Sequence, residues 1–138
     1  MKARNGQALV EFSLAFIVFA MLVFGVIDFG RGIYQYNAVS QAAREIARVT
    51  SVHPGTAPDF RSAETNAVID VQKSLVPGLI VGPNAIQCVN AAGVVQATCD
   101  FNTDSIKVTV TAPFKAITPP MNVMSAWDMN GTSSVQIQ

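Results

Sequence analysis

The chain has 138 residues, half of them hydrophobic and only 13% charged, and its formal net charge is zero. Soluble domains carry about 25% charged residues, so part of this chain is expected to lie in a membrane or against neighbouring molecules. No cluster of Lys and Arg follows Arg48, which argues against the basic surface that nucleic-acid binding requires. The length suits one membrane span followed by one small outer domain.

Residues with catalytic or metal-binding chemistry are scarce. His53 is the one histidine, and Cys88 and Cys99 do not form a C-x-x-C pair. The chain has no phosphate-binding loop, no dinucleotide-binding glycine motif and no G-x-S-x-G nucleophile motif. These observations predict a protein that is not an enzyme, with no metal site and no cofactor.

A long apolar stretch near the N-terminus is the strongest signal in the sequence. It runs from Gln7 to Ile27, which is 21 residues, with Glu11 as its only charge. About 20 helical residues cross the ~30 Å hydrocarbon core of a bilayer. The run is longer than the core of a secretory signal peptide and has no good cleavage site after it, so we expect a retained transmembrane helix. Lys2 and Arg4 precede it, which predicts a cytoplasmic N-terminus and an outer C-terminal domain.

Two residues distinguish this helix from a simple anchor. Gly6 stands just before the apolar stretch, and Glu11 stands inside it, directly before Phe12. Glu11 is close enough to the membrane surface to snorkel, which is one explanation for a charge at that position. The spacing of basic leader, glycine, glutamate and apolar helix resembles the N-terminus of type IV prepilins. With FGVIDFGRGIYQYNAVSQAAREIAR, it resembles more narrowly the TadE-like pseudopilins of bacterial tight-adherence (Flp) pilus systems, over roughly Arg4 to Ser51.

This resemblance implies a function in pilus assembly. A prepilin peptidase would cut between Gly6 and Gln7, so that residues 1–6 are a leader. Glu11 and Phe12 would then take part in assembly, the carboxylate pairing with the new N-terminal amine of a neighbouring subunit. The family implies a minor pilin in the bacterial inner membrane, on the pilus or at its base. Its expected partners are the major Flp pilin, a sister pseudopilin, the inner-membrane platform and an ATPase motor.

The sequence also allows a function of another class. The chain would then be an unprocessed, single-pass binding module held at the membrane by its helix. Such a tether needs neither Gly6 nor Glu11, so these two residues distinguish the hypotheses. Asp28, Gly30 and Arg31 stand just past the apolar stretch and form an expected membrane-edge motif, either an anchor or a contact with the platform.

The helix is expected to continue outside the membrane. Small and branched apolar residues recur at helical spacing and predict one face packed against a sheet: Val39, Ala42, Ala43, Ile46, Ala47. A break at His53-Pro54-Gly55 divides the transmembrane and extended helix, residues 7–52, from an outer head, residues 53–138. The expected fold is α+β and pilin-like, with a second helix and an antiparallel sheet of three or four strands.

The second helix is expected to open with a capping box at Thr56–Asp59 and to end at Pro77-Gly78. Its buried face would be the apolar positions Phe60, Ala63, Ala67, Val68, Val71 and Leu75.

Strand patterns follow this helix. Segments 85–89 and 94–101 are expected to flank a loop at 90–93, and 105–112 alternates most clearly between apolar and polar residues. A Cys88–Cys99 disulfide is expected outside the cytoplasm, the alternative being two reduced thiols. It favours a wider loop, a bulge or a non-paired connection over a tight hairpin.

The C-terminal region is the least regular. Met121 to Trp127 is expected to be a short helix or loop. Met124 and Trp127 are expected to pack in the core, the alternative being that they cover the sheet edge or meet a partner. Ser133 to Gln138 is expected to be an edge strand with Val135 and Ile137 facing inward.

Overall fold

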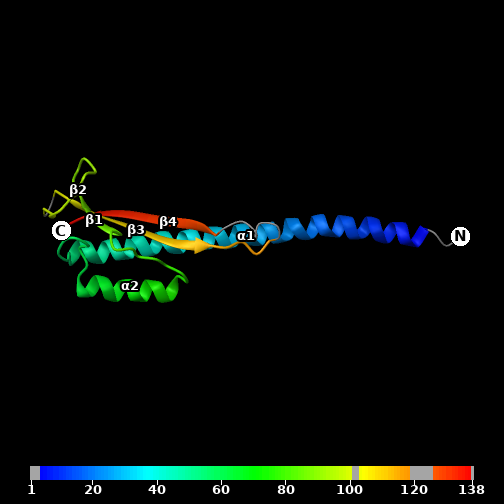
Figure 1. Ribbon diagram of the computed structural model, residues 1–138, viewed down its shortest axis with the longest axis horizontal. Helices are drawn as coiled ribbons and strands as arrows, with labels where there is room; N and C mark the ends of the chain where they lie inside the picture. The colour runs from blue at the N-terminus through cyan, green and yellow to red at the C-terminus, as the bar shows by residue number, and fades with distance from the viewer. Residues whose placement is uncertain (1–3, 101–102, 119–125, 138) are drawn as a thin grey trace.

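One helix dominates the computed structural model, and a small head surrounds its C-terminal half (Figure 1). The structure describes residues 4–100, 103–118 and 126–137. Helix α1 is Arg4–Val52, 49 residues long, and helix α2 is Ala63–Leu75. The four strands are β1 Ile86–Val89, β2 Val95–Gln96, β3 Ser105–Phe114 and β4 Trp127–Gln136. The fold is α+β, with an N-terminal helix leading into the head, as expected.

The N-terminal half of α1 stands free of the head. Within α1 lies a stretch long and apolar enough to cross a membrane, and none of that stretch is buried inside the protein. A core helix of a soluble protein would be mostly buried, so this exposure favours a membrane anchor. The ribbon of Figure 1 shows the same half projecting alone from the head.

The C-terminal half of α1 is packed between two layers. In Figure 1 the sheet runs along one side of this half and α2 along the other. The small-residue face expected from the sequence is fully buried, with every member at 0% exposure: Val39, Ala42, Ala43, Ile46, Ala47. Thr50 extends this face, and its hydroxyl lies 3.2 Å from the hydroxyl of Thr65 on α2.

The sheet is antiparallel throughout, in the order β2-β1-β3-β4. In β3 the even-numbered residues from Ile106 to Phe114 are buried, which confirms the alternation expected for this strand. The strand continues past the expected end at residue 112, through Pro113 to Phe114. The amides of Thr109 and Thr111 point toward the β1 side, where they bond to Ala85 and Ile80. Pro113 faces the same side beyond these partners, so its missing N–H costs the ladder nothing.

The start of α2 was predicted wrongly. The capping box at Thr56–Asp59 does not form, and the helix begins at Ala63 with Ser62 as its N-cap. The Ser62 hydroxyl accepts a hydrogen bond from the Thr65 amide at 3.1 Å. Phe60 is buried but lies outside the helix, at a positive φ of 49°.

The buried face of α2 was also predicted wrongly. The fully buried side chains are Thr65 and Ile69, whereas Val71 and Leu75 are exposed. The helix is short and packs against α1 through a narrow stripe, so most of its apolar positions remain outside the contact.

The loop between β1 and β2 spans residues 90–94, one residue more than the 90–93 loop expected from the sequence. Cys88 pairs with Gln96 in the sheet, and Val89 pairs with Val95. Strand β2 ends at Gln96, and the chain then turns back so that Cys99 reaches Cys88 from beyond the ladder. The disulfide is therefore made through a non-paired connection, one of the arrangements that the sequence allowed, because Cys99 is not a strand residue.

Strand β4 begins earlier than expected, at Trp127, and lies at the sheet edge as predicted. Ten residue pairs join it to β3, from Ser105–Gln136 to Phe114–Trp127. Trp127 is 50% exposed, so its expected core packing is wrong. Met124 and most of the predicted Met121–Trp127 segment lie outside the described residues.

Candidate functional site

The residues expected to function in processing and assembly lie at the free end of α1. Gly6 and Gln7 are in the first two turns of the helix and are exposed. Glu11 follows Gln7 by one turn, about 6 Å along the axis. Phe12 is 70% exposed, and its ring lies 6.1 Å from the ring of Phe16. Among the described residues of this single chain, Glu11 has no hydrogen-bond or ion-pair partner, which leaves its carboxylate open to another molecule.

Asp28 joins the helix to the head at the end of the apolar stretch. It is the first buried residue along the described side chains of α1 and is 6% exposed. Its Oδ2 accepts hydrogen bonds from the amides of Ile117 at 2.9 Å and Thr118 at 2.7 Å, and from the Thr118 hydroxyl. Its Oδ1 accepts from Arg31 at 2.9 Å. One carboxylate therefore fastens the segment after β3 to α1.

These contacts alter the acidity of Asp28, which lies outside the apolar span. The Thr118 hydroxyl bond, followed by the amides of Thr118 and Ile117 and by Arg31, lowers the pKa of Asp28 to about 2, against the opposing effect of burial. Hydrogen bonds to a carboxylate favour its charged form. Asp28 is accordingly a charged acceptor at neutral pH.

Of the other two residues in the expected membrane-edge motif, Arg31 contacts the head and Gly30 does not. Arg31 bonds Asp28, and its guanidinium carbon lies 5.7 Å from the centre of the Phe114 ring. A Cβ on Gly30 would meet nothing within 4 Å, so Gly30 takes no part in this contact. The role of Asp28 in holding the head was missed, because its partners lie 89 and 90 residues away and leave no local signal.

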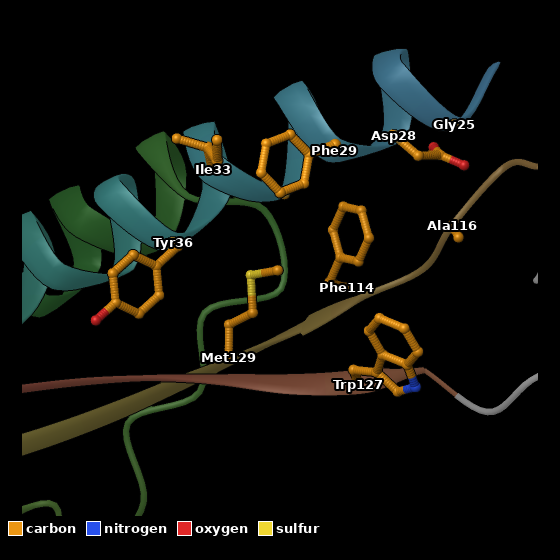
Figure 2. Close-up of a pocket in the computed structure, with 10 residues that line it drawn as sticks. Gly25, Asp28, Phe29, Ile33, Tyr36, Phe114, Ala116, Trp127 and Met129 are labelled. Atoms are coloured by element: carbon orange, nitrogen blue, oxygen red, sulfur yellow. The ribbon is translucent and has the colours of Figure 1, made fainter. Parts of the chain in front are cut away.

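An apolar groove of about 460 Å³ lies beside Asp28, between α1 and the adjoining ends of β3 and β4 (Figure 2). Phe29 and Ile33 come from the helix, and Phe114 and Trp127 come from the strands. In Figure 2 the ring of Phe29 faces the ring of Phe114 across the space. Gly32 also lies against the strands, where an added Cβ would be in ordinary contact with Met129 at 3.7 Å. Two residues that line the groove can ionise, Asp28 and Tyr36. Asp28 is already hydrogen-bonded to the head. The groove suits an apolar occupant and offers no catalytic set.

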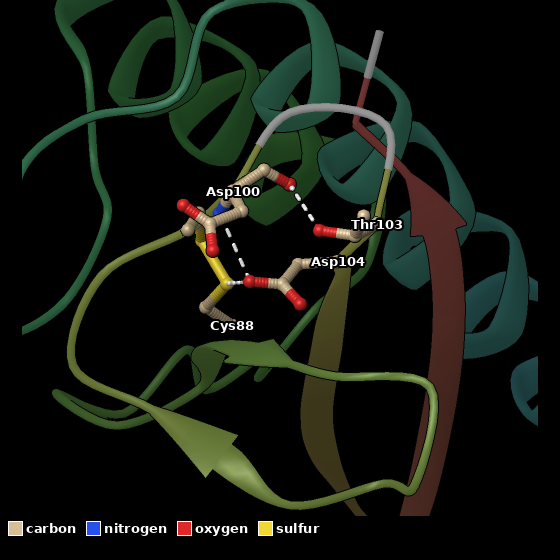
Figure 3. The surroundings of a disulfide bond; sticks show 5 residues. Cys88, Asp100, Thr103 and Asp104 are labelled. Atoms are coloured by element: carbon tan, nitrogen blue, oxygen red, sulfur yellow. Dashed lines mark hydrogen bonds between the residues drawn. A yellow bond between two sulfur atoms is a disulfide. The ribbon is translucent and has the colours of Figure 1, made fainter.

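The disulfide lies at the opposite end of the head, near the C-terminus (Figures 1 and 3). Cys88 and Cys99 are joined with their Cα atoms 5.8 Å apart. The Oδ2 atom of the buried Asp104 accepts a hydrogen bond from the Asp100 amide at 2.9 Å. The same oxygen lies 3.7 Å from the Cys88 sulfur. A disulfide sulfur has no hydrogen to donate, so this last approach is a packing contact. The bridge and Asp104 together brace the chain between β2 and β3.

No metal centre is present in the part of the chain that the structure describes, where no three His, Cys, Asp or Glu side chains gather suitably. The residues with a distinctive arrangement are therefore the free end of α1 and the junction at Asp28.

Comparisons with known proteins address the first of these regions. Neither a search of curated proteins nor a search of solved structures found a match. Residues 6–48 match the family model described as TadE-like protein, which confirms the resemblance on the segment that carries Gly6, Glu11 and Asp28.

Proposed function

We propose that this chain is a pseudopilin, or minor pilin, that is processed by a prepilin peptidase after Gly6 and helps to assemble a Flp-type pilus. The match of residues 6–48 to the TadE-like family carries this proposal. That family is associated with Tad/Flp pili and is not a family of enzymes. Gly6 and Glu11 both lie within the matched segment.

The free end of α1 supports processing at Gly6. Glycine costs about 1 kcal/mol in a helix relative to alanine, and the first turn also lacks hydrogen-bond partners for its amides. The helix is therefore weakest where a peptidase would have to open it. Gly6 is exposed, and nothing lies within 4 Å of the position that a Cβ would occupy.

The exposed carboxylate of Glu11 supports assembly. A charge held in an apolar environment is costly when alone and attracts an opposite charge strongly. Cleavage after Gly6 creates an amine on Gln7, which is an opposite charge one helical turn, about 6 Å, from the level of Glu11. We expect Glu11 of one subunit to pair with the Gln7 amine of another.

The topology follows from the flanking charges. Lys2 and Arg4 favour a cytoplasmic N-terminus and an outer head, in the inner membrane of a bacterium. The partners would be the peptidase, the major Flp pilin, a sister pseudopilin and the inner-membrane platform. In this topology the disulfide lies outside the cytoplasm, where disulfides persist.

Processing is tested by the intact mass and N-terminal sequence of the protein produced with and without the peptidase. We expect a chain that begins at Gln7 only when the peptidase is present. The Gly6→Ile variant should keep the mass of the uncut chain. The control Gly25→Ala should be cut like the wild type, and an added Cβ meets nothing within 4 Å at either glycine. A chain beginning at Met1 in every case would contradict the proposal and favour the unprocessed tether.

Assembly is tested separately with Glu11→Gln, which removes the charge and keeps the shape. We expect normal cleavage but fewer pili and less protein in the sheared pilus fraction. Glu45→Gln is the matched control, because Glu45 is half-exposed and forms an ion pair with Arg48 on the same helix. Equal assembly by Glu11→Gln and the wild type would contradict the pairing.

A further inference from the structure

The head begins where the span ends. The apolar stretch Gln7–Ile27 is 21 residues long, which is about 31 Å of helix and matches the ~30 Å hydrocarbon core. The next residue, Asp28, is buried and holds the head through Ile117 and Thr118. Because Asp28 follows the span directly, the helix has no free stalk between the bilayer and the head.

The part of the head at this level is apolar and exposed. Ile117 is bonded to Asp28 through its amide, yet its side chain is 58% exposed. Trp127 begins β4 and is 50% exposed, and it lines the groove together with Phe29, which is 70% exposed. Figure 2 shows Trp127 and Phe114 at the groove end near Asp28 and Gly25. A water-facing surface would not be expected to collect aromatic and branched apolar side chains here.

The outer face of the sheet has the opposite character. Lys107 and Thr109 of β3 point away from the core, as do Asn130 and Thr132 of β4. Thr111 on this face donates a hydrogen bond to the Asn130 side chain at 2.9 Å. The exposed aromatic ring of the sheet is thus confined to its membrane-proximal end.

We propose that this end of the head is a membrane-contact surface that sits in the interfacial layer of a phospholipid bilayer. We call it the rim and define it by its exposed side chains, Phe29, Ile117 and Trp127; the buried Phe114 ring forms the floor of the groove behind them. Trp is enriched at this depth because its ring combines an apolar body with a polar N–H. The lipid of the outer leaflet fills the groove, so that the head is seated on the bilayer.

The charges near the rim indicate what lipid is needed. Lys115 and Asp128 are both exposed beside the rim and offset one another, while Arg31 is paired with Asp28. The contact therefore rests on apolar and interfacial interactions, and neutral phosphatidylcholine suffices. The inference uses the membrane anchoring by α1 from the proposed function, and needs neither cleavage at Gly6 nor assembly.

Trp127 is the only tryptophan of the chain, so it reports its own surroundings without a label. The full chain would be reconstituted in phosphatidylcholine vesicles at a low protein-to-lipid ratio. We expect blue-shifted emission, weak quenching by aqueous iodide, and strong quenching by lipids brominated near the carbonyl end of the acyl chain. Lipids brominated near the terminal methyl should quench less, because the rim lies at the interface.

A matched control places the reporter at the far end of the head. Trp127→Phe combined with Val95→Trp moves the ring to the β1–β2 hairpin, where Val95 is 56% exposed. Its emission should be quenched by iodide and unaffected by brominated lipid. Both proteins carry the same span and should float with the vesicles.

Three outcomes would overturn the inference. Trp127 quenched by iodide but not by brominated lipid, in vesicle-bound protein, would mean that the head stands off the membrane. A second copy of the chain would occupy the groove if two results came together. Trp127 would become less quenched by iodide as the protein-to-lipid ratio rises, and brominated lipid would not quench it. Protein that fails to float would contradict the membrane anchoring itself, and with it the proposed function.

Discussion

The two halves of α1 are one continuous helix in opposite environments. From residue 7 to residue 27 the described side chains are exposed apart from Ala20 and Gly25, which are half-buried. From Val39 onward one face is fully covered by the sheet and α2. An apolar helix face therefore does not by itself indicate a protein core, because here the more apolar half of the helix is the uncovered one.

Side-chain size distinguishes the halves. The free half is rich in Phe, Leu, Ile and Val, which suit contact with lipid chains. The packed face contains Ala42, Ala43 and Ala47, which allow a strand to approach the helix closely. Gly131 of β4 completes this fit, because a Cβ there would lie 2.6 Å from the Val39 carbonyl oxygen.

The largest contrast should come from one substitution made in each half. Ile46 is fully buried and Ile17 is 58% exposed, so Ile46→Ala and Ile17→Ala remove the same atoms from different surroundings. We expect Ile46→Ala to lower the free energy of unfolding of the head by about 2–5 kcal/mol. Ile17→Ala should leave it unchanged. Urea unfolding in detergent measures both, and equal effects would mean that the free half also packs against the head.

The close approach of β4 to α1 is tested next. Gly131→Ala should destabilise the head by about 1–3 kcal/mol, because the added methyl meets backbone that cannot move without shifting the strand. Gly82→Ala is the control, since a Cβ there meets nothing within 4 Å. The same unfolding measurement applies, and a neutral Gly131→Ala would show that the strand can be displaced freely.

The boundary between the halves gives the smallest and most local effect. Asp28→Asn weakens the acceptor for Ile117 and Thr118, so hydrogen exchange at these two amides should accelerate by about tenfold or more. Exchange in β3 should change little. Asp128→Asn, at an exposed position on β4, is the control and should behave as the wild type.

Acid should reproduce the effect of Asp28→Asn. The folded-state pKa of Asp28 is lowered to about 2, so the charged form stabilises the junction fully above its ordinary pKa of about 4. That contribution is lost as the pH falls from about 4 through about 2, where wild type and variant should converge. Persistent protection of the Ile117 amide in the wild type below this range would contradict the assignment.

Much of the architecture follows from local patterns. The length of the apolar stretch predicts the free half of α1, the spacing of small residues predicts its packed face, and the alternation from Ile106 predicts β3. Each of these signals is a hydrophobic pattern that recurs along the whole element, so one residue that departs from it does not hide the pattern. The motif around Gly6 and Glu11 is likewise contained in a short segment.

The remaining features depend on residues distant in the chain. Ser62 caps α2 in preference to Thr56, Cys99 closes on Cys88 from beyond the strand, and Trp127 starts an edge strand whose partner is β3. Asp28 carries the same charge whether it faces water or holds the amides of Ile117 and Thr118. The sequence alone determined the anchor and the periodic elements, because their signals are local. Only the tertiary structure decided where the head meets the helix, because that contact joins residues about 90 positions apart.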